Sequence, residues 1–119
     1  MGRIKEWLHD CTVQLTINPA DADELLPSLR MWRDCNHLTD QRWAAEFLIE
    51  ALEDTGEGGR ISTDGHLAYE LADAFELIAK GPAQPRSWHA SQQYLRLIVL
   101  AAKYQAVVSA AIKDAFEAE

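Results

Sequence analysis

The segment 88–117 constrains the fold more than any other part of the chain. It contains no proline or glycine, and helical spacing places apolar side chains around most of its circumference over residues 94–112. Only a thin polar seam, with Arg96 and Lys103, interrupts them. A helix that is apolar on nearly every side is typical of a protein core. We therefore predict a long C-terminal helix over 88–117, wrapped by the rest of the chain.

Two more helices are predicted in the N-terminal third. The first covers residues 3–16, where helical spacing gathers one apolar stripe made of Ile4, Trp7, Leu8, Cys11 and Leu15. Asn18 and Pro19 end it and start the second, over 19–36, because Asn is a preferred N-cap and Pro suits the first helical position. Pro27 falls inside this second segment, which therefore forms either one kinked helix or two short ones.

The middle of the chain is expected to form two helices, over residues 40–54 and 63–80. Thr39 is the N-cap of the first, and a glycine-rich loop follows it, since glycine adopts the left-handed conformation that closes helices. Ser62 or Thr63 caps the second. The core face of this second helix is predicted to be Leu67, Leu71, Phe75 and Ile78.

Length and composition fit a single domain over residues 1–119. With 48% hydrophobic residues, the chain can fill one core. No segment shows the polar and apolar alternation of a strand, so we expect no β-structure. The longest fully apolar run, 97–102, is too short to cross a bilayer, and the N-terminus lacks the features of a signal peptide. The prediction is an all-α, cytoplasmic domain of four to five helices around the C-terminal one, with Cys11 and Cys35 as reduced thiols.

The net charge of −8 is concentrated in the middle of the chain. Residues 40–80 carry ten acidic and three basic side chains, a net charge of −7, and the rest of the chain carries −1. Proteins that bind nucleic acids neutralise phosphates with basic residues, so this charge argues against direct nucleic-acid binding. A protein partner with a basic surface is favoured.

Two acidic helical faces form the candidate partner-binding surface. In the helix predicted over 40–54, three glutamates lie on one side, bordered by a tryptophan and an isoleucine. In the helix predicted over 63–80, three carboxylates lie on the same face as a tyrosine and a leucine. Apolar anchors among acids suit an interface with a basic partner. The alternative is that this face packs against another helix of the chain or of a second copy. Trp88, outside these two helices, is a further candidate. The candidate partner-binding residues are Trp43, Glu46, Ile49, Glu50, Glu53, Tyr69, Glu70, Asp73, Glu76, Leu77 and Trp88.

The metal-binding and catalytic patterns in the sequence are weak. Glu6 with His9, and Asp34 with His37, have the carboxylate-x-x-histidine spacing of di-iron helical bundles. However, His9 lies opposite the apolar stripe of its predicted helix, whereas a bundle metal site must face inward. The glycine-rich loop lacks the Lys-Ser/Thr ending of a phosphate-binding loop. We expect no metal, no cofactor and no catalytic site.

In its general character the chain looks like phage- or plasmid-encoded inhibitors, such as anti-CRISPR or anti-restriction proteins. The resemblance is one of composition, since the chain is small, acidic, helical and without catalytic motifs. It implies a non-catalytic inhibitor that occupies a basic, nucleic-acid-binding surface of a partner protein. The alternatives are a structural or assembly subunit that forms a homodimer, and a metal-binding or enzymatic helical bundle.

Overall fold

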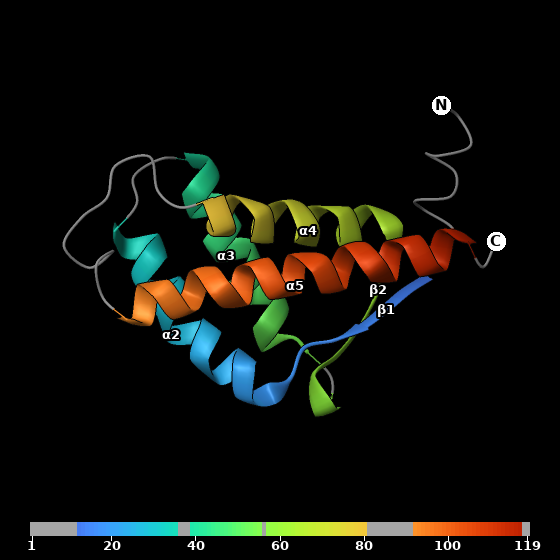
Figure 1. The fold of residues 1–119 in the computed structure, drawn as a ribbon, viewed down its shortest axis with the longest axis horizontal. Coiled ribbons are helices and arrows are strands. Elements are labelled where there is room, and N and C mark those ends of the chain that lie inside the picture. The colour runs from blue at the N-terminus through green and yellow to red at the C-terminus, as the bar shows by residue number, and fades with distance from the viewer. Residues whose placement is uncertain (1–11, 36–38, 56, 81–91, 118–119) are drawn as a thin grey trace.

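A computed structural model describes residues 12–35, 39–55, 57–80 and 92–117 of the chain (Figure 1). Within these residues four helices and a two-stranded ribbon surround one apolar core. The elements are, in order, β1 (Thr12–Thr16), α2 (Pro19–Cys35), α3 (Thr39–Glu53), the short 3-10 turn η1 (Glu57–Gly59), β2 (Arg60–Asp64), α4 (Gly65–Lys80) and α5 (Gln92–Glu117). The all-α prediction is confirmed, and the ribbon is an addition to it.

The long C-terminal helix α5 supports the rest of the molecule on one side only. α4 runs beside it, and α2 and β1 also pack against it (Figure 1). Its core residues are Leu97, Leu100, Ala101, Tyr104, Val108 and Ile112. The opposite face is exposed, so the other elements pack around this helix on one side and leave part of its circumference uncovered. Among the described helices only α5 is long and apolar enough to cross a membrane by composition, although its longest fully apolar run is shorter than a span.

Residues 12–16 form a strand, which corrects the predicted helix over 3–16 and the expected absence of β-structure. Val13 and Leu15 are buried, while the threonines and the glutamine between them are exposed. This alternation and the β-branched residues favour a strand. Over so few residues, apolar spacing alone does not separate a strand from one end of a helix. The segment 3–11 lies outside the described residues.

β2 runs antiparallel to β1, with Thr12 opposite Asp64. The strand covers the positions at which Ser62 or Thr63 is predicted to cap a helix, and this prediction is wrong. α4 begins directly after the strand, and its cap is Asp64, whose Oδ1 accepts a hydrogen bond from the Leu67 amide at 2.8 Å. The ribbon therefore holds the N-terminal strand beside the first turn of α4.

The glycine-rich loop between α3 and β2 is a closely fitted turn. Gly58 and Gly59 have φ values of 73° and 78°, in the left-handed region that glycine tolerates. The carbonyl of Gly59 accepts a hydrogen bond from the Ile17 amide at 2.9 Å. A Cβ atom on Gly59 would lie 1.8 Å from the Ile17 carbonyl oxygen, so only glycine fits there.

α2 is one continuous helix through Pro27, which settles the choice between one helix and two. Asn18 caps it as predicted, because its Oδ1 accepts a hydrogen bond from the Ala20 amide at 2.9 Å. Near the other end, Trp32 is fully buried and donates its indole N–H to the Gln41 carbonyl at 3.2 Å. This bond ties the end of α2 to the start of α3.

In α3 and α4, one residue predicted to be exposed is buried and one predicted to be buried is exposed. Ile49 is only 7% exposed and belongs to the core, whereas Leu67 is 43% exposed. Leu71, Phe75 and Ile78 are buried, as the predicted core face of α4 requires. Leu67 is exposed because it lies at the start of α4, above a pocket that the neighbouring helix does not fill.

A buried polar network joins α2 to α5. The Tyr104 hydroxyl donates a hydrogen bond to Oδ2 of Asp21 at 2.6 Å and accepts one from the Asn18 amide at 3.0 Å. Lys103 donates to the same carboxylate oxygen at 2.8 Å. The hydrogen bonds from Lys103 and Tyr104 hold the pKa of Asp21 below its ordinary value, against the opposing effect of burial.

Candidate functional site

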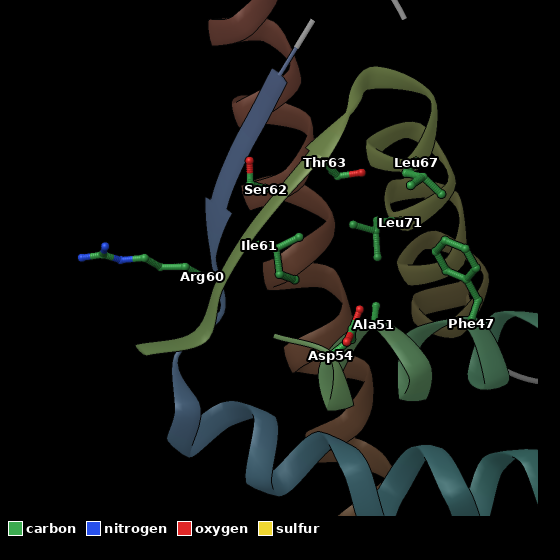
Figure 2. Close-up of a pocket in the computed structure, with 9 residues that line it drawn as sticks. All are labelled: Phe47, Ala51, Asp54, Arg60, Ile61, Ser62, Thr63, Leu67 and Leu71. Atoms are coloured by element: carbon green, nitrogen blue, oxygen red, sulfur yellow. The ribbon is translucent and has the colours of Figure 1, made fainter. Parts of the chain in front are cut away.

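An open pocket lies between α3, β2 and the start of α4 (Figure 2). Its volume of about 360 Å³ is in the range of small-molecule and side-chain sites. The pocket is lined by Phe47, Ala51, Asp54, Arg60, Ile61, Ser62, Thr63, Leu67 and Leu71. We call it the α3–β2 pocket.

Apolar side chains from three elements form its walls. Ile61 of β2, Leu71 of α4 and Phe47 of α3 point toward the same space (Figure 2). Leu67 stands at the rim, where it is partly exposed to solvent. Because strand residues alternate between faces, β2 directs Ile61 toward the helices. The pocket thus depends on the strand that the sequence-based prediction missed.

Two polar groups in the pocket have no partner among the described residues. The Thr63 hydroxyl oxygen is buried and forms no hydrogen bond there. Asp54 lies at the other end, and its carboxylate forms no ion pair with any described residue, since Arg60 extends away from the pocket (Figure 2). A buried hydroxyl without a partner is unfavourable.

The apolar lining continues onto the outer surface of α3. The rings of Trp43 and Phe47 pack with centroids 5.4 Å apart, and Trp43 is exposed. Trp43 is one of the predicted contact residues, and Phe47, which the prediction omits, links it to the pocket. Glu50 lies on the same exposed side of α3 and forms no ion pair within the described chain. Aromatic surface and an unpaired carboxylate therefore lie on the side of α3 that carries the pocket residue Phe47.

The predicted acidic row on α3 is partly neutralised within the chain. Glu46 pairs with Arg42 at 3.3 Å, and Glu53 pairs with Arg30 of α2 at 2.9 Å. Both pairs are exposed and contribute little to stability, but each cation reduces the negative potential of the row. Glu50 is the member of the row that no described cation neutralises.

The predicted apolar anchors do not gather at this pocket. Tyr69 is exposed on the other side of α4, where it lines a groove of about 330 Å³ with Phe116 of α5. Leu77 is partly buried and packs against the core. Ile49 is buried, so it cannot form a contact surface. Trp88 lies outside the described residues.

The outward face of α4 carries the remaining predicted carboxylates. Glu70 lies 3.5 Å from the imidazole Nε2 of His66, and Glu76 accepts a hydrogen bond from Lys80 at 3.0 Å. Asp73 is exposed and forms no ion pair with a described residue. This face is therefore acidic, with one carboxylate beside an imidazole and another paired with a lysine.

Within the described residues, no three His, Cys, Asp or Glu side chains are arranged to hold a metal ion. Glu6, His9 and His37 of the two carboxylate-x-x-histidine pairs lie outside these residues, as does Cys11. Asp34 pairs with Arg33 at 3.3 Å. The di-iron pattern thus stays a weak sequence hypothesis.

Fold and site together define a small helical domain that carries a two-stranded ribbon and a surface pocket with apolar walls. No protein-family model, curated protein or solved structure matches the chain. Its function therefore has to be argued from the chemistry of its own surface.

Proposed function

We propose that this chain is a non-catalytic, acidic protein-binding domain that uses the α3–β2 pocket as its main contact site. The pocket carries the proposal, because its apolar walls open at the surface beside a carboxylate and a buried hydroxyl that lack partners in the described chain. A partner segment with an apolar side chain in the pocket and a basic side chain near Asp54 and Glu50 would match both features.

The charge of the chain supports a basic partner. Residues 40–80, which include both α3 and α4, carry most of the net charge of −8. A negative surface accelerates the encounter with a positive one, and buried apolar anchors then supply most of the affinity. Trp43, Phe47 and Leu67 are the apolar anchors in this proposal.

The partner class that we propose is a cytoplasmic protein with a basic, nucleic-acid-binding surface. Carboxylates at the pocket rim would pair with the same Lys and Arg side chains that bind phosphates, so the complex would exclude the nucleic acid. This activity is the one suggested by the compositional resemblance to anti-CRISPR and anti-restriction inhibitors. The chain acts in this proposal by occupying a surface, without chemistry of its own.

Two matched pairs of variants test the pocket. Asp54→Lys is compared with Asp23→Lys, because both residues are exposed carboxylates without an ion pair among the described residues. Leu67→Glu is compared with Met31→Glu, since these side chains are 43% and 41% exposed. The tagged chain captures partners from its native host, and the affinity of a purified partner is then measured by calorimetry.

We expect Asp54→Lys and Leu67→Glu each to weaken binding at least about tenfold, a loss of about 1.4 kcal/mol, while the two controls bind like the wild type. The affinity should also fall with rising salt, and added nucleic acid should compete. Equal losses in test and control variants would remove the pocket from the proposal. A partner that binds nucleic acid and the chain at the same time would contradict the inhibitory role.

A further inference from the structure

The strand β2 has one unpaired edge. Among the described residues, β2 pairs only with β1. The Ile17 amide donates to the Gly59 carbonyl, so these two residues form a hydrogen-bonded pair. Such pairs alternate along an antiparallel ribbon with pairs whose N–H and C=O groups point away from the partner strand. Gln14 and Ser62 lie opposite each other three positions along the ribbon, and they therefore direct these groups to its two outer edges. Arg60 does so on the same edge as Ser62.

The α3–β2 pocket lies along this outer edge of β2. Four consecutive strand residues, 60–63, line it, although successive side chains of a strand point to opposite faces. Figure 2 shows Arg60 and Ser62 on the side opposite to Ile61 and Thr63. The main chain of β2 therefore forms part of the lining. No described group forms a hydrogen bond with the main chain of Arg60 or Ser62 at this edge. The pocket thus combines apolar walls with unpaired N–H and C=O groups.

We propose that the partner of the α3–β2 pocket is an extended peptide segment, which adds to β2 as the third strand of the ribbon. This inference rests on the proposed function and names the form of the partner. The N–H and C=O groups of an extended chain repeat at the spacing of those on Arg60 and Ser62. A helix or a folded surface uses its own main-chain groups internally, and it would bury those of β2 without partners.

The register of an added strand predicts which side chains the segment carries. Its residues opposite Ile61 and Thr63 share the face of these two residues, which is the face toward Leu67 and Leu71. These two positions of the segment are two residues apart, and both should be apolar. A Lys or Arg two residues beyond the position opposite Ile61 would lie toward Asp54, whose carboxylate forms no ion pair with a described residue. The predicted pattern is therefore apolar-x-apolar-x-basic, read toward the Asp54 end of the pocket.

A peptide selection on the purified full chain supplies the probe. Short random peptides displayed on phage are selected on the immobilised chain, and the most enriched sequence is synthesised. Calorimetry then measures its affinity for the chain in solution. We expect the enriched sequences to share the alternating pattern. A selection that enriches no peptide, or only peptides without apolar residues at alternate positions, would overturn the proposal.

Proline variants test the main-chain hydrogen bonds. Ser62→Pro removes the N–H that faces the added strand and should weaken binding of the synthetic peptide at least about tenfold. Gln14→Pro is the matched control, because Gln14 lies opposite Ser62 and its N–H faces the other edge of the ribbon. Proline is tolerated at such edge positions, so the control should bind like the wild type. Circular dichroism confirms that both variants keep their helices.

Amide hydrogen exchange tests the same contact in the wild-type chain, without any substitution. With the synthetic peptide bound, the Ser62 amide should exchange at least about tenfold more slowly than in the free chain, because a third strand would accept its hydrogen bond. The Gln14 amide should exchange at the same rate in both states. Equal exchange of the Ser62 amide in the free and bound chain would overturn strand addition even if a proline variant fails to fold.

The outcomes separate this inference from the proposed function. If Asp54→Lys and Leu67→Glu weaken binding of a purified host partner but Ser62→Pro does not, the pocket stays the contact site and strand addition is overturned. If none of the three variants weakens it, both proposals fail. A dimer of the 13.4 kDa chain that is seen by light scattering and lost in Ser62→Pro would also overturn the inference, because a second copy would then occupy the edge.

Discussion

The hydroxyl of Tyr104 lies 2.6 Å from Oδ2 of Asp21, and this hydrogen bond joins residues that are 83 positions apart in the sequence. Both side chains are buried, and the same hydroxyl accepts a hydrogen bond from the Asn18 amide at the start of α2. The bond therefore fixes the N-terminus of α2 against the middle of α5. Because the acceptor is a charged carboxylate, its loss should cost more than that of a neutral hydrogen bond.

Tyr104→Phe should lower the free energy of unfolding by about 1.5–3 kcal/mol, because it removes the donor to a buried carboxylate and the acceptor of a backbone amide. Tyr69→Phe is the matched control, since the Tyr69 side chain is exposed, and it should change stability by less than about 0.5 kcal/mol. Urea unfolding followed by circular dichroism measures both. Equal stability of the two variants would contradict the role assigned to the network.

Asp21 should make the stability depend on pH in the acid range. Its pKa in the folded state is below the ordinary value of 3.8, so its contribution is fully present above that value and is lost as the pH falls through the lower folded-state pKa. The stability difference between the wild type and Asp21→Asn should therefore shrink as the pH falls below 3.8. Urea unfolding at a series of pH values measures it, and a difference that stays constant would show that Asp21 does not have this lowered pKa.

Val13→Ala distinguishes the strand β1 from the helix predicted over 3–16. Val13 is fully buried in the strand, and its truncation should cost about 1.5–3 kcal/mol. In the predicted helix it would lie opposite the apolar stripe, where truncation would cost little. Gln14→Ala is the control at an exposed neighbouring position and should leave the unfolding midpoint in urea nearly unchanged.

Gly59→Ala should destabilise the fold more than Gly58→Ala. Both residues have positive φ, and an alanine there costs about 1–2 kcal/mol. A Cβ atom on Gly59 would also collide with the Ile17 carbonyl, whereas one on Gly58 has no atom within 4 Å. Thermal unfolding of the two variants should therefore differ by several degrees, with Gly59→Ala the lower. Equal melting temperatures would show that the turn is not as close to Ile17 as the structure places it.

The helices could be predicted because their signals are local. Asn18 and Pro19 mark the start of α2, and the absence of proline and glycine allows α5 to continue without a break. The ribbon could not be predicted in the same way, because five residues of β1 form a strand only by pairing with β2, which follows much later in the sequence. The local signs were the alternation of Val13 and Leu15 with polar residues and the β-branched side chains of the segment.

The candidate site was predictable only in part, for the same reason. Trp43 and Glu50 follow from the helical periodicity of α3, since both lie on its exposed side. Phe47 and Leu67 belong to the pocket because β2 brings Ile61 between the two helices, and this arrangement is not local. Ile49 was predicted to be exposed but is buried, because the periodicity of one helix does not reveal how much of its surface the neighbouring helices α2 and α4 cover.

The contacts of β1 also affect when the fold can form during protein synthesis. Among the described elements β1 is synthesised first, yet its strand partner lies in residues 60–64 and the helix that covers its buried face lies in 92–117. The first described element therefore reaches its native packing only after the last described element has been synthesised. β1 can acquire its native packing only after α5 has left the ribosomal exit tunnel, and a nascent chain truncated before α5 leaves Val13 and Leu15 without the helix that covers them.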